Sequence, residues 1–166
     1  MKKLTPIPEI WLNPAPNLDL INSAPIPVDI SESDLSWSAL NSLIFTIRQA
    51  ETASFQALSY RDFRVGAAAM TFNPTTRNLG LVTGFNVKPS KENTINVHAE
   101  QMVIEKVRHH ELGQILALAV WGEPQIDDAN AQESPTLHPC ALCREMISEA
   151  PEITPSTAIL SSNPGF

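Results

Sequence analysis

The chain has 166 residues, of which 43% are apolar, and it carries a formal net charge of -7 at pH 7. This length fits one domain, and the apolar content is sufficient for a buried core, which excludes wholesale disorder. The acidic balance disfavours a nucleic-acid partner, because phosphate backbones attract basic surfaces. The sequence contains no run of 18 apolar residues and therefore predicts no membrane span.

The N-terminal segment is rich in proline. Residues 1–28 hold six of the 14 prolines, and Pro6, Pro8 and Glu9 come too early for an apolar signal segment to form. We therefore expect a proline-rich arm over residues 1–30, a single domain over residues 31–166, and a cytoplasmic location. The arm either lies along its own domain or a partner subunit, or it is a flexible tail.

After the arm, hydrophobic spacing and turn signals predict alternating helices and strands. Ser33 is a candidate N-cap for the first helix, and residues 73–78 predict a turn between two strands. The expected elements are a helix over 34–55, strands over 65–72 and 79–87, a helix over 97–110, a strand over 115–121, a polar loop over 122–138, a helix over 140–150 and a strand over 157–161. This alternation predicts an α/β fold in which helices cover a sheet.

Two short motifs fall at the starts of the second and third predicted helices. The first contains His98, and the second is a C-x-x-C segment that contains both cysteines of the chain, Cys140 and Cys143. Zinc is bound by imidazole and thiolate, and a catalytic zinc site supplies three protein ligands and leaves the fourth position open. We therefore expect Zn²⁺ bound by these three residues. The free amides and the dipole of a helix start favour thiolates, so we also expect both cysteines to ligate readily.

Glu100 follows His98 by two residues, on the same first helical turn, so it can face the open position. A carboxylate there can accept a proton from water and return it to a leaving nitrogen. Taken singly, the histidine could be a helix cap, the cysteines a redox pair and Glu100 a solvated acid. A structural zinc site would need a fourth ligand, and His138 is too close to Cys140 to join it easily. The combination matches the H-x-E and P-C-x-x-C signature of zinc deaminases.

The chain resembles the cytidine deaminase superfamily over residues 34–150, and most of all the cytidine deaminases with one His and two Cys ligands. Three further stretches carry this resemblance: Tyr60-Arg61-Asp62-Phe63-Arg64-Val65-Gly66-Ala67-Ala68, Gly84-Phe85-Asn86-Val87 and Cys143-Arg144-Glu145-Met146-Ile147. Gln101 after the Glu also follows the pattern of that ligand type. The resemblance implies a three-layer α/β/α fold with a mixed sheet of about four to five strands. It also implies a homo-oligomer, either a dimer or a tetramer.

The resemblance further implies a function: zinc-dependent hydrolytic deamination of cytidine or deoxycytidine, as in pyrimidine salvage. The catalytic residue would be Glu100, and the substrate-binding residues would be Phe63, Asn86, Lys88 and Ala99. At the position of Lys88 the family usually has an acid that bonds the sugar. In this chain Glu92 could fill that role instead. Two alternatives are therefore open. One is a deaminase of another small aminated pyrimidine, such as a nucleotide or a nucleoside antibiotic, and the other is a catalytically idle zinc-binding interaction module.

Overall fold

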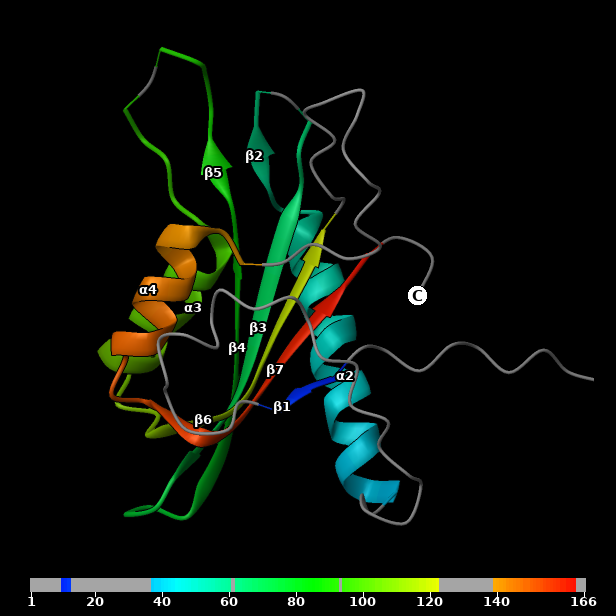
Figure 1. Ribbon diagram of the computed structural model, residues 1–166, viewed down its shortest axis with the longest axis vertical. Coiled ribbons are helices and arrows are strands. Elements are labelled where there is room, and N and C mark those ends of the chain that lie inside the picture. The colour runs from blue at the N-terminus through cyan, green and yellow to red at the C-terminus, as the bar shows by residue number, and fades with distance from the viewer. Residues whose placement is uncertain (1–9, 13–36, 61, 93, 123–138, 164–166) are drawn as a thin grey trace, which may run out of the picture.

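The computed structural model describes residues 10–12, 37–60, 62–92, 94–122 and 139–163 (Figure 1). The elements are β1 (Ile10–Leu12), α2 (Trp37–Ser54), β2 (Leu58–Ser59), β3 (Val65–Asn73), β4 (Asn78–Phe85), β5 (Val87–Lys88), α3 (Ala99–His109), β6 (Gln114–Gly122), α4 (Ala141–Glu149) and β7 (Ile153–Ser162). No helix among these residues is long and apolar enough to cross a membrane.

The main sheet has five strands in the order β1-β7-β6-β3-β4. Strand β3 runs antiparallel to both β4 and β6, whereas β6 and β7 are parallel, so the sheet is mixed. Helix α2 covers one face, and α3 and α4 cover the other (Figure 1). A separate parallel pair, β2 and β5, lies next to the sheet. The predicted α/β/α layering and the predicted sheet size are confirmed.

Small side chains on the sheet let α2 pack closely against it. The buried residues under the helix include Ala68, Ala117, Ala119 and Ala158, and α2 contributes Leu43, Ile47 and Ala50. The approach is tightest at Gly66 on β3, where an added Cβ would overlap the carbonyl oxygen of Ala50 and lie 2.6 Å from the backbone nitrogen of Ser54. Glycine at position 66 therefore permits this helix–sheet contact.

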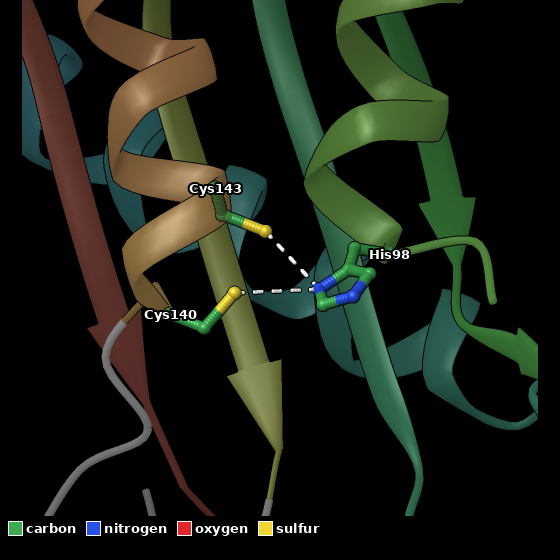
Figure 2. Close-up of side chains that lie close together, drawn as sticks. All are labelled: His98, Cys140 and Cys143. Carbon is green, nitrogen blue, oxygen red and sulfur yellow. Dashed lines mark hydrogen bonds between the residues drawn. The ribbon is translucent and has the colours of Figure 1, made fainter.

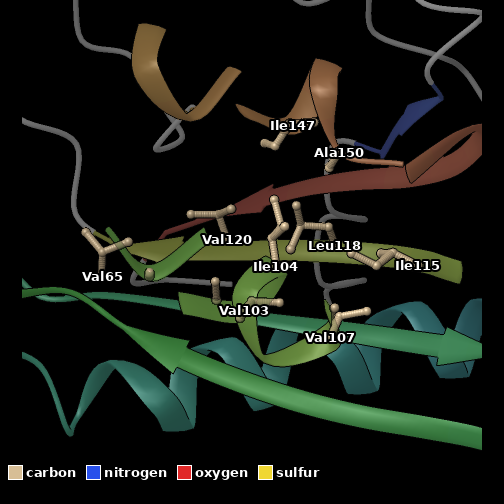
Figure 3. Packing of buried hydrophobic residues seen from close by; sticks show 12 residues of the cluster. Val65, Val103, Ile104, Val107, Ile115, Leu118, Val120, Ile147 and Ala150 are labelled. Carbon is tan, nitrogen blue, oxygen red and sulfur yellow. The ribbon is translucent and has the colours of Figure 1, made fainter. Parts of the chain in front are cut away.

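Larger aliphatic side chains fill the opposite face (Figure 3). Val103, Ile104 and Val107 of α3 pack with Ile115, Leu118 and Val120 of β6, and Ile147 of α4 joins them. Because α3 and α4 share this layer, their N-terminal ends lie close together at one end of the sheet (Figure 1). The burial of these side chains thus positions the two predicted metal-binding motifs.

Several predicted boundaries differ from the observed ones. Helix α3 begins at Ala99 rather than at residue 97, because Val97 pairs with Val87 in extended conformation. The strand predicted over 79–87 is interrupted at Asn86 and continues as β5. The last strand begins at Ile153 rather than at residue 157, and β1 and β2 were not predicted. The predicted loop began at residue 122, but Gly122 is the last residue of β6. The rest of that loop, residues 123–138, and the Ser33 cap lie outside the described residues.

The close contact at Gly66 gives a test of the packing of α2. Gly66→Ala should destabilise the fold by about 1–3 kcal/mol or more, because the added methyl group meets rigid helix backbone. Gly80→Ala is the matched control, since its added Cβ meets the side chains of Thr71 and Leu112 and no backbone. Thermal unfolding should show a clearly larger loss for Gly66→Ala, and equal losses would contradict this account of the packing.

Candidate zinc site

The structure brings His98, Cys140 and Cys143 together (Figure 2). The Nδ1 atom of His98 lies 3.5 Å from Sγ of Cys140 and 3.3 Å from Sγ of Cys143. Their possible ligand atoms all lie within 4.8 Å of one another, and neither cysteine is in a disulfide. Among the described residues, these three form the one group of at least three His, Cys, Asp or Glu side chains that could hold a metal ion.

These distances and donor types fit a zinc ion. Zinc–nitrogen bonds of about 2.0–2.1 Å and zinc–sulfur bonds of about 2.3 Å, at tetrahedral angles, place the nitrogen and each sulfur about 3.5 Å apart. The two observed nitrogen–sulfur distances therefore match a tetrahedral site with Nδ1 as the imidazole ligand. His98 is partly exposed and Cys140 is exposed, whereas Cys143 is buried. His138, the alternative fourth ligand, lies outside the described residues.

Local structure holds each ligand at a helix start. His98 is the N-cap of α3 and Cys140 the N-cap of α4, and both have extended backbone conformations. Val97 and Val87 exchange two backbone hydrogen bonds of 2.9 and 3.0 Å, which anchor the chain just before His98. Arg144 donates from Nη1 to the carbonyl oxygen of Pro139 at 3.0 Å, which restrains the residue just before Cys140. The motif alone did not reveal this role of Arg144.

Glu100 is buried beside the three ligands, with only 4% of its surface exposed. Burial raises the pKa of its carboxyl group above the ordinary value, although a backbone hydrogen bond, the Cys143 thiol and the nearby His98 oppose the rise. A raised pKa brings a carboxyl group closer to neutral pH, where it can both accept and donate a proton. Glu100 thus lies where the sequence predicted it, in an environment that suits proton transfer.

The expectation that both cysteines ligate readily stays a prediction, but without a cation the surroundings of Cys143 act against thiolate formation. Burial raises the pKa of the Cys143 thiol far above its ordinary value, and the Glu100 carboxylate and Cys140 raise it further. These effects outweigh the helix dipole invoked for this position. A nearby divalent cation would reverse the balance, because its charge stabilises a coordinated thiolate. The donor set therefore requires a cation in order to carry negative charge at Cys143.

Of the predicted substrate-binding residues, Lys88 ends β5 and Ala99 begins α3, whereas Phe63 and Asn86 lie outside the helices and strands. Phe63 packs against the buried cluster on the α3 side, and Ala99 is fully buried at the start of α3. Asn86 accepts a hydrogen bond from Val65 N–H at 2.8 Å and donates one to the carbonyl oxygen of Phe63 at 2.8 Å. Its amide therefore fixes the entry to β3. A role for any of these residues in binding substrate stays a prediction.

Val87 and Val97 form an antiparallel bridge, and polar residues flank both of them in the sequence. In an antiparallel bridge, opposite residues share a face and neighbours along a strand alternate. Asn86 and Lys88 therefore lie on the same side as His98 and Asn96. Lys88 is partly exposed, and Glu92, the alternative sugar contact, is exposed. Asn96, which the sequence did not single out, places its Nδ2 atom 3.2 Å from Nε2 of His98.

The chain combines an α/β/α fold with a His-Cys-Cys cluster at two helix starts. The family described as "Cytidine and deoxycytidylate deaminase zinc-binding region" matches residues 41–155, more than half of the chain. The chain therefore belongs to this family, and the predicted resemblance is confirmed. No curated protein matches the sequence.

The chain is also similar to solved structures of cytidine deaminases. A cytidine deaminase from Burkholderia pseudomallei is 22% identical, with a TM-score of 0.56 over 73% of this chain and 84% of that chain. A cytidine deaminase from Mycobacterium leprae is 22% identical over 76% and 94% of the two chains, with a TM-score of 0.49. One from Mycobacterium tuberculosis is 24% identical over 76% and 91%, also with a TM-score of 0.49. The first of these similarities supports the α/β/α architecture.

The geometry predicts one zinc ion per chain. Elemental analysis of protein purified without chelator should find one equivalent, and His98→Ala should bind much less because one of three ligands is lost. His109→Ala is the matched control, since His109 is exposed at the far end of the same helix. Full zinc content in His98→Ala would contradict the ligand assignment.

Proposed function

We propose that the protein is a hydrolase that uses zinc to deaminate cytidine or deoxycytidine to uridine or deoxyuridine, a reaction of pyrimidine salvage. The observation that carries this proposal is the burial of Glu100 beside His98, Cys140 and Cys143. Membership of a family of cytidine and deoxycytidylate deaminases supports it. A carboxyl group is costly to bury, so a domain that used zinc only for structure would gain nothing from one here.

The roles of the chain's residues follow from their positions. His98, Cys140 and Cys143 hold the metal, which when bound lowers the pKa of water and so supplies a nucleophile at neutral pH. Glu100 accepts the proton of the attacking water and passes it to the ring nitrogen of the base. Glu100 then accepts the second proton, from the hydroxyl group added to the ring carbon, and delivers it to the amino group; the C–N bond breaks as the carbonyl forms, and ammonia leaves. The raised pKa of this buried carboxyl group supports both directions of transfer.

The remaining residues hold the substrate. Ala99 lies between His98 and Glu100, and the family resemblance assigns it to the amino-bearing edge of the base. Phe63 borders the base, and Asn86 contacts the sugar. The Asn86 amide already bonds to the backbone at residues 63 and 65, so one side chain fixes both its own position and that of Phe63. Preorganisation of this kind lowers the cost of binding.

Glu100→Gln is the direct test of the reaction. It keeps the size of the side chain and removes its ability to transfer protons, so ammonia release should fall by about 100- to 10,000-fold. Because Glu100 serves more than one transfer, the upper part of this range is expected. Glu105→Gln, an exposed acid on the same helix, should leave activity unchanged. Activity of Glu100→Gln within a few-fold of wild type would remove Glu100 from the mechanism.

A nucleotide substrate is the second candidate, and Lys88 favours it. The family resemblance aligns Lys88 with a position where relatives of this type usually carry an acid that bonds the sugar. The bridge between Val87 and Val97 supports a site there, because it favours Lys88 on the same side as Asn86 and His98. A cation there can pair with a phosphate. An acid that bonds the ribose hydroxyl would be left unpaired by deoxyribose, and this penalty would favour ribose. With Lys88 in place of the acid there is no such penalty, so discrimination between ribose and deoxyribose weakens.

The substrate panel tests Lys88. Wild type should deaminate cytidine and deoxycytidine with kcat/KM values within about tenfold of each other, which corresponds to roughly 1.4 kcal/mol. If Lys88 meets a phosphate, the nucleotide should be the better substrate, and Lys88→Glu should abolish that preference. Lys91→Glu is the control, because Lys91 is exposed in the loop that follows β5. Strict selectivity for cytidine that Lys88→Glu does not change would contradict both accounts of Lys88.

We also propose that residues 1–30 form an arm and that residues 31–166 form the deaminase domain.

A homo-oligomer with closed symmetry is the last part of this proposal. Exposed apolar side chains on α2 and β4 support association. Phe45 is 51% exposed, and Leu79 and Leu81 are 70% and 39% exposed. Light scattering should give the mass of a dimer or a tetramer at micromolar concentration, and a monomer would contradict this part of the proposal.

A further inference from the structure

Asn96 lies against the side of the His98 ring that faces away from the cysteines. The Nδ1 atom of the ring faces the sulfur atoms, at 3.3 and 3.5 Å, and the opposite nitrogen, Nε2, lies 3.2 Å from Nδ2 of Asn96. The imidazole is thus contacted at both of its nitrogen atoms. Asn96 and His98 are two residues apart in extended chain, so their side chains leave the backbone on the same side.

The backbone around Asn96 is held in place. Val97, which separates Asn96 from His98, exchanges hydrogen bonds of 2.9 and 3.0 Å with Val87 on β5. Strand β5 is in turn paired with β2. The contact between Asn96 and His98 is therefore set by a short stretch of sheet-like structure rather than by a free loop end. A side chain anchored in this way can restrain the rotation of the ring.

The chemistry of the ring defines what Asn96 must do. If Nδ1 gives its lone pair to a metal, the remaining proton of a neutral imidazole is on Nε2, and that N–H needs an acceptor. The two ends of an asparagine amide are nearly indistinguishable in shape, and a rotation of 180° puts Oδ1 where Nδ2 is. Asn96 can therefore accept the Nε2 proton through Oδ1 without movement of the backbone.

We propose that Asn96 is a positioning residue for the metal site, which accepts a hydrogen bond from Nε2 of His98 and so holds the imidazole with Nδ1 directed at the metal. Histidine ligands usually donate their second ring N–H to a partner that fixes the tautomer and the ring orientation, and loss of that partner commonly weakens metal binding 10- to 100-fold. The inference rests on the proposed zinc site and deepens it, since it adds a residue that does not touch the metal.

The experiment measures zinc affinity by competition with a chelator of known affinity, in folded protein checked by circular dichroism. Asn96→Leu keeps the approximate volume and removes both hydrogen-bonding groups, so the Kd for zinc should rise about 10- to 100-fold. Asn96→Asp keeps an acceptor at the same position and should bind within threefold of wild type, or more tightly. Asn41→Leu, the same exchange at an exposed site on α2, should leave the Kd unchanged.

A second readout separates this role from a merely structural one. In zinc-loaded protein labelled with ¹⁵N-histidine, the four histidines can be distinguished by comparison with His98→Ala. Wild type and Asn96→Asp should show His98 with its proton on Nε2, and that proton should exchange slowly with water. In Asn96→Leu it should exchange quickly. A general loosening of the fold would not be rescued by Asp.

The outcomes distinguish this inference from the zinc site itself. If His98→Ala loses zinc but Asn96→Leu binds within threefold of wild type, the role of Asn96 is overturned and the zinc site stands. If His98→Ala binds zinc as tightly as wild type, the ligand assignment fails, and the role of Asn96 fails with it. If Asn96→Leu does not fold, Asn96→Asp decides, because a tenfold loss of zinc affinity in that variant also overturns the proposal.

Discussion

The site depends on two helix starts that are far apart in the chain and must meet within a few ångströms. His98 and Cys140 are 42 residues apart, yet Nδ1 and Sγ lie 3.5 Å from each other. The packing of α3 and α4 on one face of the sheet produces this proximity, with Val103 and Ile147 against the aliphatic residues of β6. A change in the buried layer that tilts either helix would also move a ligand, so the geometry of the metal site depends on the packing of this layer.

Burial makes this end of the sheet costly for the protein's own charges. Glu100 and Cys143 are both buried and in contact. The Glu100 carboxylate makes ionisation of the Cys143 thiol less favourable, whereas the hydrogen bond from the thiol favours the ionised form of Glu100. If both groups are ionised, the pair lowers stability unless a cation balances it. The stability of the fold and the occupancy of the site are therefore thermodynamically coupled, since a ligand that binds only the folded chain stabilises it by mass action.

The short motifs carried most of what could be predicted about the site. Histidine, glutamate and paired cysteines have side chains with specific metal and proton chemistry, so their spacing points to a function before any fold is known. The alternation of apolar segments likewise predicted the layers, because burial on a sheet requires it. The family resemblance then assigned residues such as Asn86 to the substrate, which spacing alone does not do.

The contacts of Asn96 and Arg144 could not be predicted in the same way. Each depends on where the backbone of another segment lies: Asn96 on the bridge between Val87 and Val97, and Arg144 on the carbonyl group of Pro139. Helix α3 begins two residues later than predicted for the same reason. The apolar spacing predicts Val97 within the helix, but the bridge to Val87 keeps it extended. Strand β1 was missed because surrounding prolines indicate irregular chain, whereas a neighbouring strand supplied its partner.

That pairing of β1 with β7 has a consequence for biosynthesis. Ile10 pairs with Leu160, so the first described strand completes an edge that is formed by the last one. During translation β1 leaves the ribosome long before β7 exists, and it remains without its partner while α2, β3, β4 and β6 are made. Contacts of such high sequence separation form late, after the rest of the sheet has reduced the entropy of closing the chain. Until then an apolar strand and an open sheet edge both lack their partner, and unpaired edges of this kind favour association between chains.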